Sequence, residues 1–409
     1  MKILVLNCGS SSVKFQLIET SAEQIANNQD RTLAHGLVER IGAPDAKVSF
    51  EVQGADGIHE VRPILRHKDA IEAVFTFLSA EGKVVGALEE IAGVGHRVAH
   101  GGERFHASTF IDDAVVKEIE ALSDLAPLHN PHNLKGYYAS RALLPHAAQA
   151  AVFDTAFHQT LPPHAYLYGL PYIYYTRDKL RRYGFHGTSH RFVSYRYAQI
   201  HGRERAAYKL ITCHLGNGCS VCAIDRGQSI DTSMGFTPLE GLLMGTRPGD
   251  VDPGAVLYMV DRAEMGTHEM EVTLNRHSGL YGISGVSGDM RDLLAAADAG
   301  NARAQIAVDT FCYRVAKYIG AYAVALGGVD AVLFAGGIGE NAALVREKIC
   351  ARLEFLGLRF DAERNHAAVG SEAAISAEGS TLQAWVIPTN EELLIARDTV
   401  RLMLGIANE

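Results

Sequence analysis

The chain has 409 residues and a formal net charge of −9, and 47% of its residues are hydrophobic while 21% are charged. These values predict a folded protein of two or three domains. The acidic balance argues against nucleic acid or an anionic membrane as a partner, because both require a basic face.

The chain opens with the apolar stretch Ile3-Leu4-Val5-Leu6, which leads through Asn7-Cys8-Gly9-Ser10-Ser11-Ser12 into the alternating segment 13–18. The pattern predicts a β-hairpin whose tight turn exposes backbone N–H groups to an anion, with Lys14 adding a positive charge. An ordinary Ser-rich turn is the alternative, because the spacing of a Walker P-loop is absent. The apolar stretch is too short for a signal peptide, and no run reaches the ~18 residues of a membrane span. We therefore expect a cytoplasmic protein with no membrane partner.

Two arginines stand beside glycines: Arg97 within residues 95–102 and Arg247 within residues 245–250. A fixed guanidinium in such a setting suits the binding of a carboxylate or a phosphate. For either arginine alone, a surface salt bridge is the simpler explanation. Phosphoryl transfer spreads negative charge over several oxygens, which gives a physical reason for both.

Amphipathic periodicity predicts helices between these motifs. Asp112 and Asp113 open one of them, since acidic residues favour a helix N-terminus. Apolar residues at steps of three and four between Val308 and Leu326 predict a longer helix. The mixture of helices and strands predicts an α/β protein.

Carboxylates follow two apolar runs. Asp154 comes directly after the run 150–153, where a strand-end carboxylate often acts as a metal ligand or base and a helix cap is the alternative. Glu391 and Glu392 follow residues 385–390 and offer hard oxygen ligands for Mg²⁺, although such a pair usually begins a solvated helix.

Histidines and cysteines are grouped without forming a zinc signature. His186 and His190 have the spacing of helical metal ligands, but Gly187 argues against a helix and no second ligand pair follows Cys219 and Cys222. We therefore predict neutral histidines that donate hydrogen bonds, six reduced cysteines, and burial of Cys219 and Cys222 in a strand.

Two later segments repeat the opening plan of a strand that runs into a glycine turn. Residues 210–224 predict a second β-hairpin around Gly216-Asn217-Gly218, and the strand 331–335 leads into residues 336–341 and a helical pattern. Two similar hairpins half a chain apart predict a duplicated domain plan with a cleft between the halves.

Together these segments resemble the acetate kinase family over almost the whole chain. Any one motif is modest evidence, whereas all of them in order are highly specific. The matching motifs are Asn-x-Gly-Ser-Ser-Ser-x-Lys at 7–14, Gly-His-Arg-Val-x-His-Gly-Gly at 95–102, Phe-Asp-Thr-x-Phe-His at 153–158, Arg-Arg-Tyr-Gly-Phe-His-Gly-Thr-Ser-His at 181–190, His-Leu-Gly-Asn-Gly at 214–218, Asp-Thr-Ser-Met-Gly at 231–235, Gly-Gly-Ile-Gly-Glu-Asn at 336–341 and Thr-Asn-Glu-Glu at 389–392.

The resemblance implies two ribonuclease-H-like domains around a central nucleotide cleft, as in actin, the sugar kinases and Hsp70, and a homodimer. We expect an N-terminal domain of residues 1–153 plus 393–409 and a nucleotide-binding domain of residues 154–392. The implied reaction is the reversible, Mg-dependent and in-line transfer of the γ-phosphoryl group of ATP to acetate, giving acetyl phosphate and ADP.

The resemblance also implies roles for particular residues. Arg97 would bind the substrate carboxylate, and Asp154 would be the catalytic carboxylate. Arg247 and His186 would stabilise the transferring phosphoryl group, with His129 near it. A carboxylic acid has a pKa near that of a Glu side chain, about 4.3, so at pH 7 it is already the nucleophile. Asp154 is therefore expected to orient Arg97, a histidine or the metal shell rather than to act as a base.

Ligand sets follow from the same resemblance. Mg²⁺, with Mn²⁺ as a substitute, would be held by Asn7 and Glu391. ATP or ADP would contact Ser10, Ser12, Lys14, His214, Leu215, Gly216, Asn217, Gly218, Asp289, Met290, Arg291, Gly337, Ile338, Gly339, Glu340 and Asn341. The short acyl chain would lie among Arg97, Ala99, Leu128, Phe185 and Pro238.

Two residues depart from the family pattern. Acetate-specific members commonly carry valine at the position of Ala99, and alanine leaves more room, as in the related propionate kinases. A methylene is worth about 1–3 kcal/mol in discrimination, so use of both acids is expected. Pro248 stands after Arg247 where serine is frequent, and it biases Arg247 towards an extended backbone.

Three alternatives stand beside this interpretation. Propionate kinase is the nearest. An NAD-dependent oxidoreductase would explain Gly337-x-Gly339-x-x-Ala342 with Asp361 about twenty residues on, but it leaves the first hairpin and both arginines unexplained. A non-catalytic or chaperone-type ATPase would need an additional peptide-binding or polymerising segment.

Overall fold

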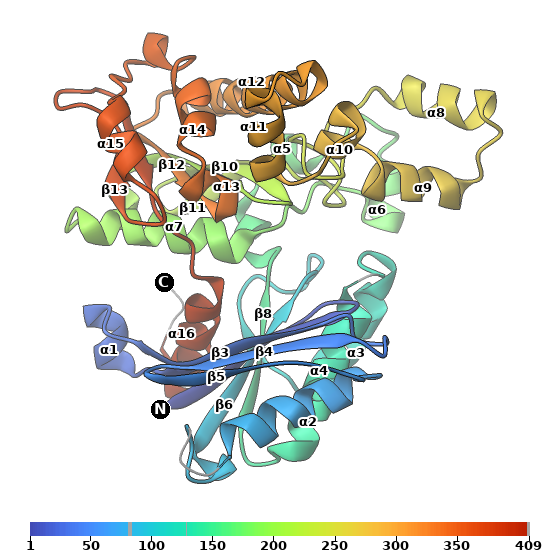
Figure 1. Ribbon diagram of the computed structural model, residues 1–409, viewed down its shortest axis with the longest axis vertical. Coiled ribbons are helices and arrows are strands. Elements are labelled where there is room, and N and C mark those ends of the chain that lie inside the picture. The colour runs from blue at the N-terminus through green and yellow to red at the C-terminus, as the bar shows by residue number, and fades with distance from the viewer. Residues whose placement is uncertain (81–83, 128, 407–409) are drawn as a thin grey trace. The chain divides into compact units, whose positions relative to one another are not determined.

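The structure, a computed structural model, describes residues 1–80, 84–127 and 129–406 and divides the chain into two compact units. Unit 1 comprises Met1–Phe157 together with Asn390–Glu409, and unit 2 comprises His158–Thr389. Each unit is an α/β structure built on one mixed sheet, as the sequence predicts (Figure 1).

Within the described residues, unit 1 has an eight-stranded sheet in the order β5-β4-β3-β2-β1-β6-β8-β7. Its strands are β1 (Lys2–Cys8), β2 (Ser12–Glu19), β3 (Arg31–Glu39), β4 (Ala46–Val52), β5 (Ala55–Arg62), β6 (Ile91–Val98), β7 (Thr109–Phe110) and β8 (Ala148–Phe153). Its helices are α1 (Ala22–Asn27), α2 (His67–Leu78), α3 (Asp113–Ala121), α4 (Asn130–Leu143) and α16 (Glu391–Leu404). The antiparallel pair β1–β2 is the predicted first hairpin, and β6 and β8 continue the sheet parallel to β1.

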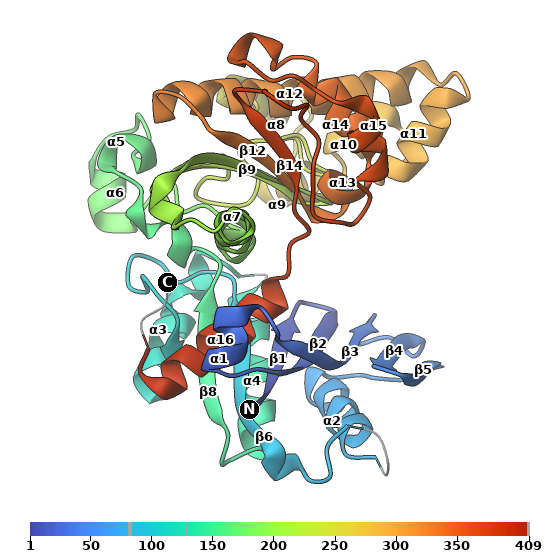
Figure 2. The same cartoon turned by 90° about the vertical axis from the view of Figure 1, so that its left-hand side faces the viewer.

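Side chains of β1 are buried on both faces of this sheet. Leu4 and Leu6 belong to a core shared with α2 and α4, whereas Ile3 and Val5 pack with the apolar side of α16. Figure 2 shows α1 beside α16, and Ile25 of α1 joins the same cluster. A strand covered on both faces is held rigidly, so the polar residues at its end are held rigidly as well.

Within unit 1, a buried ion pair joins the helix α16 to the segment after α1. Arg397 donates from Nη2 to Asp30 Oδ2 at 2.5 Å and to Asn28 Oδ1 at 2.6 Å, and both charged side chains are at least 97% buried. Removing one partner of such a pair typically costs about 3–5 kcal/mol. The pair thus fixes the helix that begins with Glu391.

Unit 2 repeats the strand plan of unit 1. Its six-stranded sheet has the order β11-β10-β9-β12-β14-β13 within the described residues. The strands are β9 (Lys209–Leu215), β10 (Cys219–Asp225), β11 (Gln228–Thr232), β12 (Ala331–Ala335), β13 (Ala373–Ala374) and β14 (Gln383–Val386). β9, β10 and β11 are successively antiparallel, while β12 and β14 run parallel to β9. The same relations join β1, β2, β3, β6 and β8, which confirms the duplicated, ribonuclease-H-like plan.

Unit 2 also contains helices within the described residues. They are α5 (Pro163–Tyr166), α6 (Ile173–Asp178), α7 (Gly187–Ile200), α8 (Pro253–Arg262), α9 (Thr267–Arg276), α10 (Gly279–Ser284), α11 (Met290–Asp298), α12 (Ala302–Leu326), α13 (Gly336–Asn341), α14 (Ala343–Cys350) and α15 (Ala362–Ala367). The predicted long helix is α12, whose Phe311 and Val315 share a core with Ile211 and Val221 of the sheet. All six cysteines are buried and none is in a disulfide, and Cys219 and Cys222 lie in the strand β10, as predicted.

None of the helices within the described residues combines the length and the apolar character that crossing a membrane requires.

Candidate functional site

Arg97 and Asp154 meet at the ends of two neighbouring parallel strands of unit 1. The backbone N–H of Asp154 donates to the carbonyl of Val98 at 3.0 Å, which places Asp154 just beyond β8, beside the end of β6. Arg97 Nε lies 3.1 and 3.0 Å from the two carboxylate oxygens, and Nη2 lies 2.5 Å from Oδ2. This fork geometry fixes the plane of the guanidinium.

Asn7 joins the pair from the next strand. Its Oδ1 accepts a hydrogen bond from Arg97 Nη1 at 3.2 Å, and β1 lies parallel to β6 in the sheet. The carboxyl ends of parallel strands are where open α/β sheets place ligands. The structure therefore brings Asn7, Arg97 and Asp154 together at one edge of the sheet of unit 1.

Acidic groups surround this arginine. Burial opposes its charge, but Asp154, Glu391 and Glu392 raise the pKa of Arg97 above its ordinary value, so the guanidinium stays charged. Burial raises the pKa of Asp154, the Arg97 charge opposes that rise, and Glu391 adds to it. His129, the residue before α4, also acts electrostatically on Asp154 and lowers its pKa.

Asn7 and Glu391 fit the predicted magnesium site by their chemistry. Both offer oxygen atoms near Arg97, and Mg²⁺ in kinases is typically held by one or two protein groups together with phosphates and waters. No cluster of three or more His, Cys, Asp or Glu residues suited to a metal exists in the described part of the chain.

The turn predicted to bind phosphate, residues 9–11, lies at the tip of the β1–β2 hairpin and is called the phosphate turn below. Gly9 N–H donates to Ser12 O at 2.8 Å, which closes the turn, and Ser10 is exposed. Lys14 is half exposed and pairs with Glu392 Oε1 at 2.5 Å. The hydroxyl of Ser10 and the Lys14 ammonium are thus both reachable by a ligand.

In unit 2, His186 and Arg247 lie against the second hairpin. His186 Nδ1 is 2.9 Å from Ser220 Oγ, and its ring packs on His214 with centroids 4.2 Å apart. A Cβ built on Gly218 would meet Arg247 Nη2 at 2.6 Å and the His186 ring at 3.5 Å. Any side chain at position 218 would therefore collide with Arg247.

One prediction about this region is wrong. Gly187 does not prevent a helix: α7 begins at Gly187, because His186 adopts a left-handed conformation with φ of 56° and turns the chain into the helix. His190, inside α7, is buried between Thr212 Oγ1 and Ser220 Oγ at 2.7 Å each. Burial lowers its pKa well below the ordinary value, so it is a neutral histidine of the core.

Arg247 differs electrostatically from Arg97. Nη1 donates to the carbonyl of Pro238 at 2.8 Å, and within the described residues no carboxylate forms a salt bridge with Arg247. Burial lowers the pKa of Arg247. A buried cation without a carboxylate partner favours binding of an anion.

The predicted nucleotide-binding segments of unit 2 are adjacent to one another. Gly245 N–H donates to Asn217 O at 3.0 Å, and a Cβ on Gly245 would lie 3.1 Å from the carbonyl of Gly288. A Cβ on Gly216 would lie 4.0 Å from the backbone nitrogen of Gly337. Glycines thus lie where the second hairpin approaches the segments near 288 and 337.

The ends of these segments are held by internal hydrogen bonds. Asp289 caps α11 through Arg291 N–H at 2.8 Å, and Met290 is buried. Glu340 Oε1 accepts the N–H groups of Gly336 at 2.8 Å and Thr389 at 3.0 Å. The carboxylate of Glu340 therefore stabilises its own loop.

The predicted acyl-pocket residues divide between the units. Ala99 is buried in unit 1, while Phe185 and Pro238 lie beside His186 and Arg247 in unit 2. Leu128 lies outside the described residues. Each unit therefore carries only part of the predicted acyl pocket.

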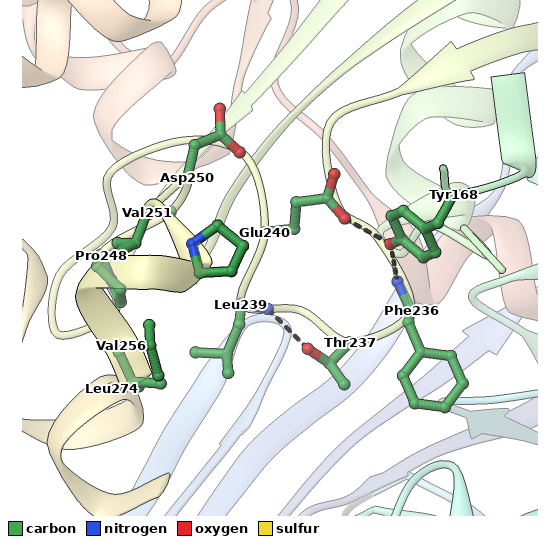
Figure 3. Close-up of a pocket in the computed structure, with 12 residues that line it drawn as sticks. Tyr168, Phe236, Thr237, Leu239, Glu240, Pro248, Asp250, Val251, Val256 and Leu274 are labelled. Carbon is green, nitrogen blue, oxygen red and sulfur yellow. Dashed lines mark hydrogen bonds between the residues drawn. The ribbon is translucent and has the colours of Figure 1, made fainter. Parts of the chain in front are cut away.

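A pocket of about 420 Å³ in unit 2 is lined by none of the residues predicted to bind the acid, the nucleotide or the metal. It lies beside the loop that carries Pro238 and Arg247, and its walls include Leu239 and Pro248 (Figure 3). Tyr168 Oη, on its edge, donates to Glu240 Oε2 at 2.5 Å and accepts from Phe236 N–H at 2.8 Å. These two hydrogen bonds of Tyr168 thus stabilise the loop that carries Pro238.

Sequence reasoning missed several supporting residues. Ser220 bridges His186 and His190, and Asn130 and Asn133 hold backbone groups next to the predicted site. A signal for the asparagines was available, because both stand on one face of the helix after His129, at a spacing of three residues.

The chain resembles known proteins over almost its whole length. A model described as the acetokinase family matches residues 2–397. The acetate kinase of Chloroherpeton thalassium is 50% identical and covers 99% of both chains, and that of Treponema denticola is 51% identical over 98% of this chain and 100% of its own. Among solved structures, Porphyromonas gingivalis acetate kinase has a TM-score of 0.93 at 43% identity, covering 98% of this chain and 99% of its own. A propionate kinase from Francisella tularensis has a TM-score of 0.90 at 41% identity, covering 99% and 100%.

Proposed function

This chain belongs to the acetokinase family, and from that premise we propose that it transfers the γ-phosphoryl group of ATP reversibly to acetate, giving acetyl phosphate and ADP. The observation that carries the proposal is the match over nearly the full length, at about half of all positions, to several acetate kinases. The NAD-dependent alternative is set aside, because Asp361 caps α15 instead of ending a strand of a dinucleotide-binding fold.

We propose that unit 1 binds the acid. Arg97 offers its charge to the substrate carboxylate, and Asp154 holds the guanidinium in one plane. Acetate is ionised at neutral pH, so it attacks without a general base. Bidentate support of this kind keeps the attacking oxygen in line with the phosphorus.

We propose that unit 2 stabilises the transferring phosphoryl group. Arg247 is a buried cation with which no carboxylate of the described residues forms a salt bridge, and His186 lies beside it at Gly218. Charge on the equatorial oxygens increases in the transition state, where fixed donors are most effective. Mg²⁺ held by Asn7 and Glu391, or Mn²⁺ in its place, would neutralise charge on the nucleotide phosphates.

The test is a hydroxamate assay for acyl phosphate with ATP and Mg²⁺, using acetate, propionate and butyrate in parallel. We expect a signal with acetate and its loss when EDTA removes the metal. Properly folded protein that forms no acyl phosphate from any acid would contradict the proposal.

Propionate is the second candidate substrate, because Ala99 is buried at the predicted acyl pocket and the Francisella tularensis relative is a propionate kinase. We expect Ala99→Val to lower kcat/KM for propionate about 10-fold or more relative to acetate, since a methylene is worth about 1–3 kcal/mol in a tight pocket. Steady-state kinetics with both acids measure this ratio. An unchanged ratio in a variant with wild-type melting temperature would place the acyl chain elsewhere.

We further propose that the enzyme is a cytoplasmic homodimer. Six buried, unpaired cysteines suit a reducing compartment. On α8, Leu257 is 69% and Tyr258 is 64% exposed, and Tyr172 beside α6 is 62% exposed. Large apolar side chains that are exposed in this way favour a protein interface.

Sedimentation velocity tests this interface. The double variant Leu257→Glu with Tyr258→Glu is expected to sediment as a monomer at micromolar concentration, because like charges would face each other across a two-fold axis. Val324→Glu is the matched control, since Val324 is also apolar and 81% exposed but lies on α12. Dissociation by the control alone would assign the interface to α12.

A further inference from the structure

The side chain of Asn133 connects two backbone segments of unit 1. Its Nδ2 donates to the carbonyl of Cys8 at 2.8 Å, and its Oδ1 accepts from the N–H of Ala99 at 3.1 Å. Asn133 is buried on α4. Cys8 stands between Asn7 and the phosphate turn, and Ala99 is two residues beyond Arg97. The side-chain amide of Asn133 therefore contacts the backbone next to the phosphate turn and the backbone next to Arg97.

This amide lies where the ladder between the strands ends. Parallel pairing of β1 with β6 stops at Leu6 and His96. Beyond that point β1 and β6 no longer form backbone hydrogen bonds with each other. Any buried N–H or carbonyl group there needs a hydrogen-bond partner from another part of the chain. Asn133 supplies a donor to one strand and an acceptor to the other.

Other contacts make α4 a close-fitting support for these strand ends. A Cβ on Gly136 would lie 2.5 Å from Cys8 Sγ, so only glycine allows the helix to approach so closely. Asn130 accepts His100 N–H at 3.1 Å and donates to His100 O at 3.1 Å. Asn130, Asn133 and Gly136 follow at steps of three and form one helix face.

We propose that Asn133 is a positioning residue that fixes the distance between the phosphate turn and the acid-binding end of β6. The inference rests on the proposed function, which assigns the turn to the phosphates and Arg97 to the acid. In-line transfer requires both reactants to be held within a fraction of an ångström, and a displacement of about 1 Å can cost 10²-fold in rate. Asn133 sets that distance without contacting either reactant.

Asn133→Asp tests the inference with almost no change of shape. The ionised carboxylate of this variant still accepts from Ala99 N–H but repels the Cys8 carbonyl, which has lost its donor. We expect kcat for acetyl phosphate formation at pH 8 to fall about 100-fold. Burial raises the pKa of an introduced carboxyl group, and once protonated it can donate to the Cys8 carbonyl again. The ratio of variant to wild-type kcat is therefore expected to rise as the pH falls from 8 to 5.

Ser140→Ala is the matched control. Ser140 is fully buried on the same helix, bonds to Tyr137 O and Gln149 Oε1, and has its Oγ 3.4 Å from His96 Nε2. These contacts lie on α4, β6 and β8 and involve neither the Cys8 carbonyl nor the Ala99 N–H that Asn133 holds. We expect this variant to lose stability without a change in kcat or in the pH profile. All rates are compared on protein shown to be folded by its melting curve at each pH.

Three outcomes decide the inference. Wild-type protein that forms no acyl phosphate would refute the proposed function itself. Active wild type together with an equally active, folded Asn133→Asp variant would overturn the positioning role. A loss in Asn133→Asp that stays constant between pH 8 and pH 5 would also overturn it, since the hydrogen bond to Cys8 would then have no part in the effect.

Discussion

Arg247→Met is expected to lower kcat by about 10³–10⁵-fold, the range over which an arginine acting on a transferring phosphoryl group contributes to catalysis. Methionine keeps the volume and removes the charge. Because burial lowers the pKa of Arg247 and no carboxylate forms a salt bridge with it in the described part of the chain, this guanidinium is costly in the folded protein. The variant should therefore melt at or above the wild-type temperature.

The combination of lost activity with retained stability separates this prediction from general damage. Steady-state kinetics and thermal melting measure the two quantities on the same preparation. Arg247→Lys provides the control, because it keeps a charge but loses the fork that contacts Pro238, and it should recover only part of the rate. A variant that melts well below wild type would indicate that Arg247 is structural.

The two arginines of the proposed site are thus built differently. Arg97 is surrounded by Asp154, Glu391 and Glu392, which raise its pKa, whereas Arg247 has no such support. A paired arginine is held in place before the substrate arrives and can orient a singly charged carboxylate. An arginine whose charge is not neutralised by a carboxylate stabilises a ligand most where the ligand's negative charge is greatest, which is at the phosphoryl group.

The sequence predicted those parts of the fold that depend on local pattern. Alternation and turn chemistry located the β1–β2 and β9–β10 hairpins, and the period of α12 was evident from Val308 to Leu326. The start of α7 was not predictable, because a left-handed His186 depends on the contacts of its ring and not on the preference of its neighbours.

The candidate site was predictable only as a set of residue types. Arg97 and Asp154 were each identified, but their bidentate pairing depends on the register of β6 with β8, which joins residues more than fifty positions apart. Asn133 was overlooked because the three-residue spacing of Asn130 and Asn133 indicates a shared helix face but not the backbone groups that this face contacts. Long-range pairing of this kind is fixed by tertiary packing, which no short window of sequence contains.

Asp154→Asn provides the second large effect, expected as a fall in kcat of at least about 10²-fold with a smaller change in the KM for acetate. The substitution keeps an oxygen that can accept from Arg97 Nε but removes the charge and one of the two accepting oxygens. Arg97 would then be free to rotate, and the acid would be bound in orientations that do not react.

The pH dependence tests whether the acid limb of the kcat profile comes from Asp154. If the limb reports only the ionisation of the substrate, it should keep its shape in Asp154→Asn, because the ionised substrate needs no proton acceptor. Loss of that limb in the variant would instead assign the limb to the ionisation of Asp154. Asp178→Asn is the control, since Asp178 also pairs with an arginine, Arg177, at 2.7 Å but in an exposed position where such pairs contribute little. An equal fall in both variants would mean that the Arg97 pair has no special part in the reaction.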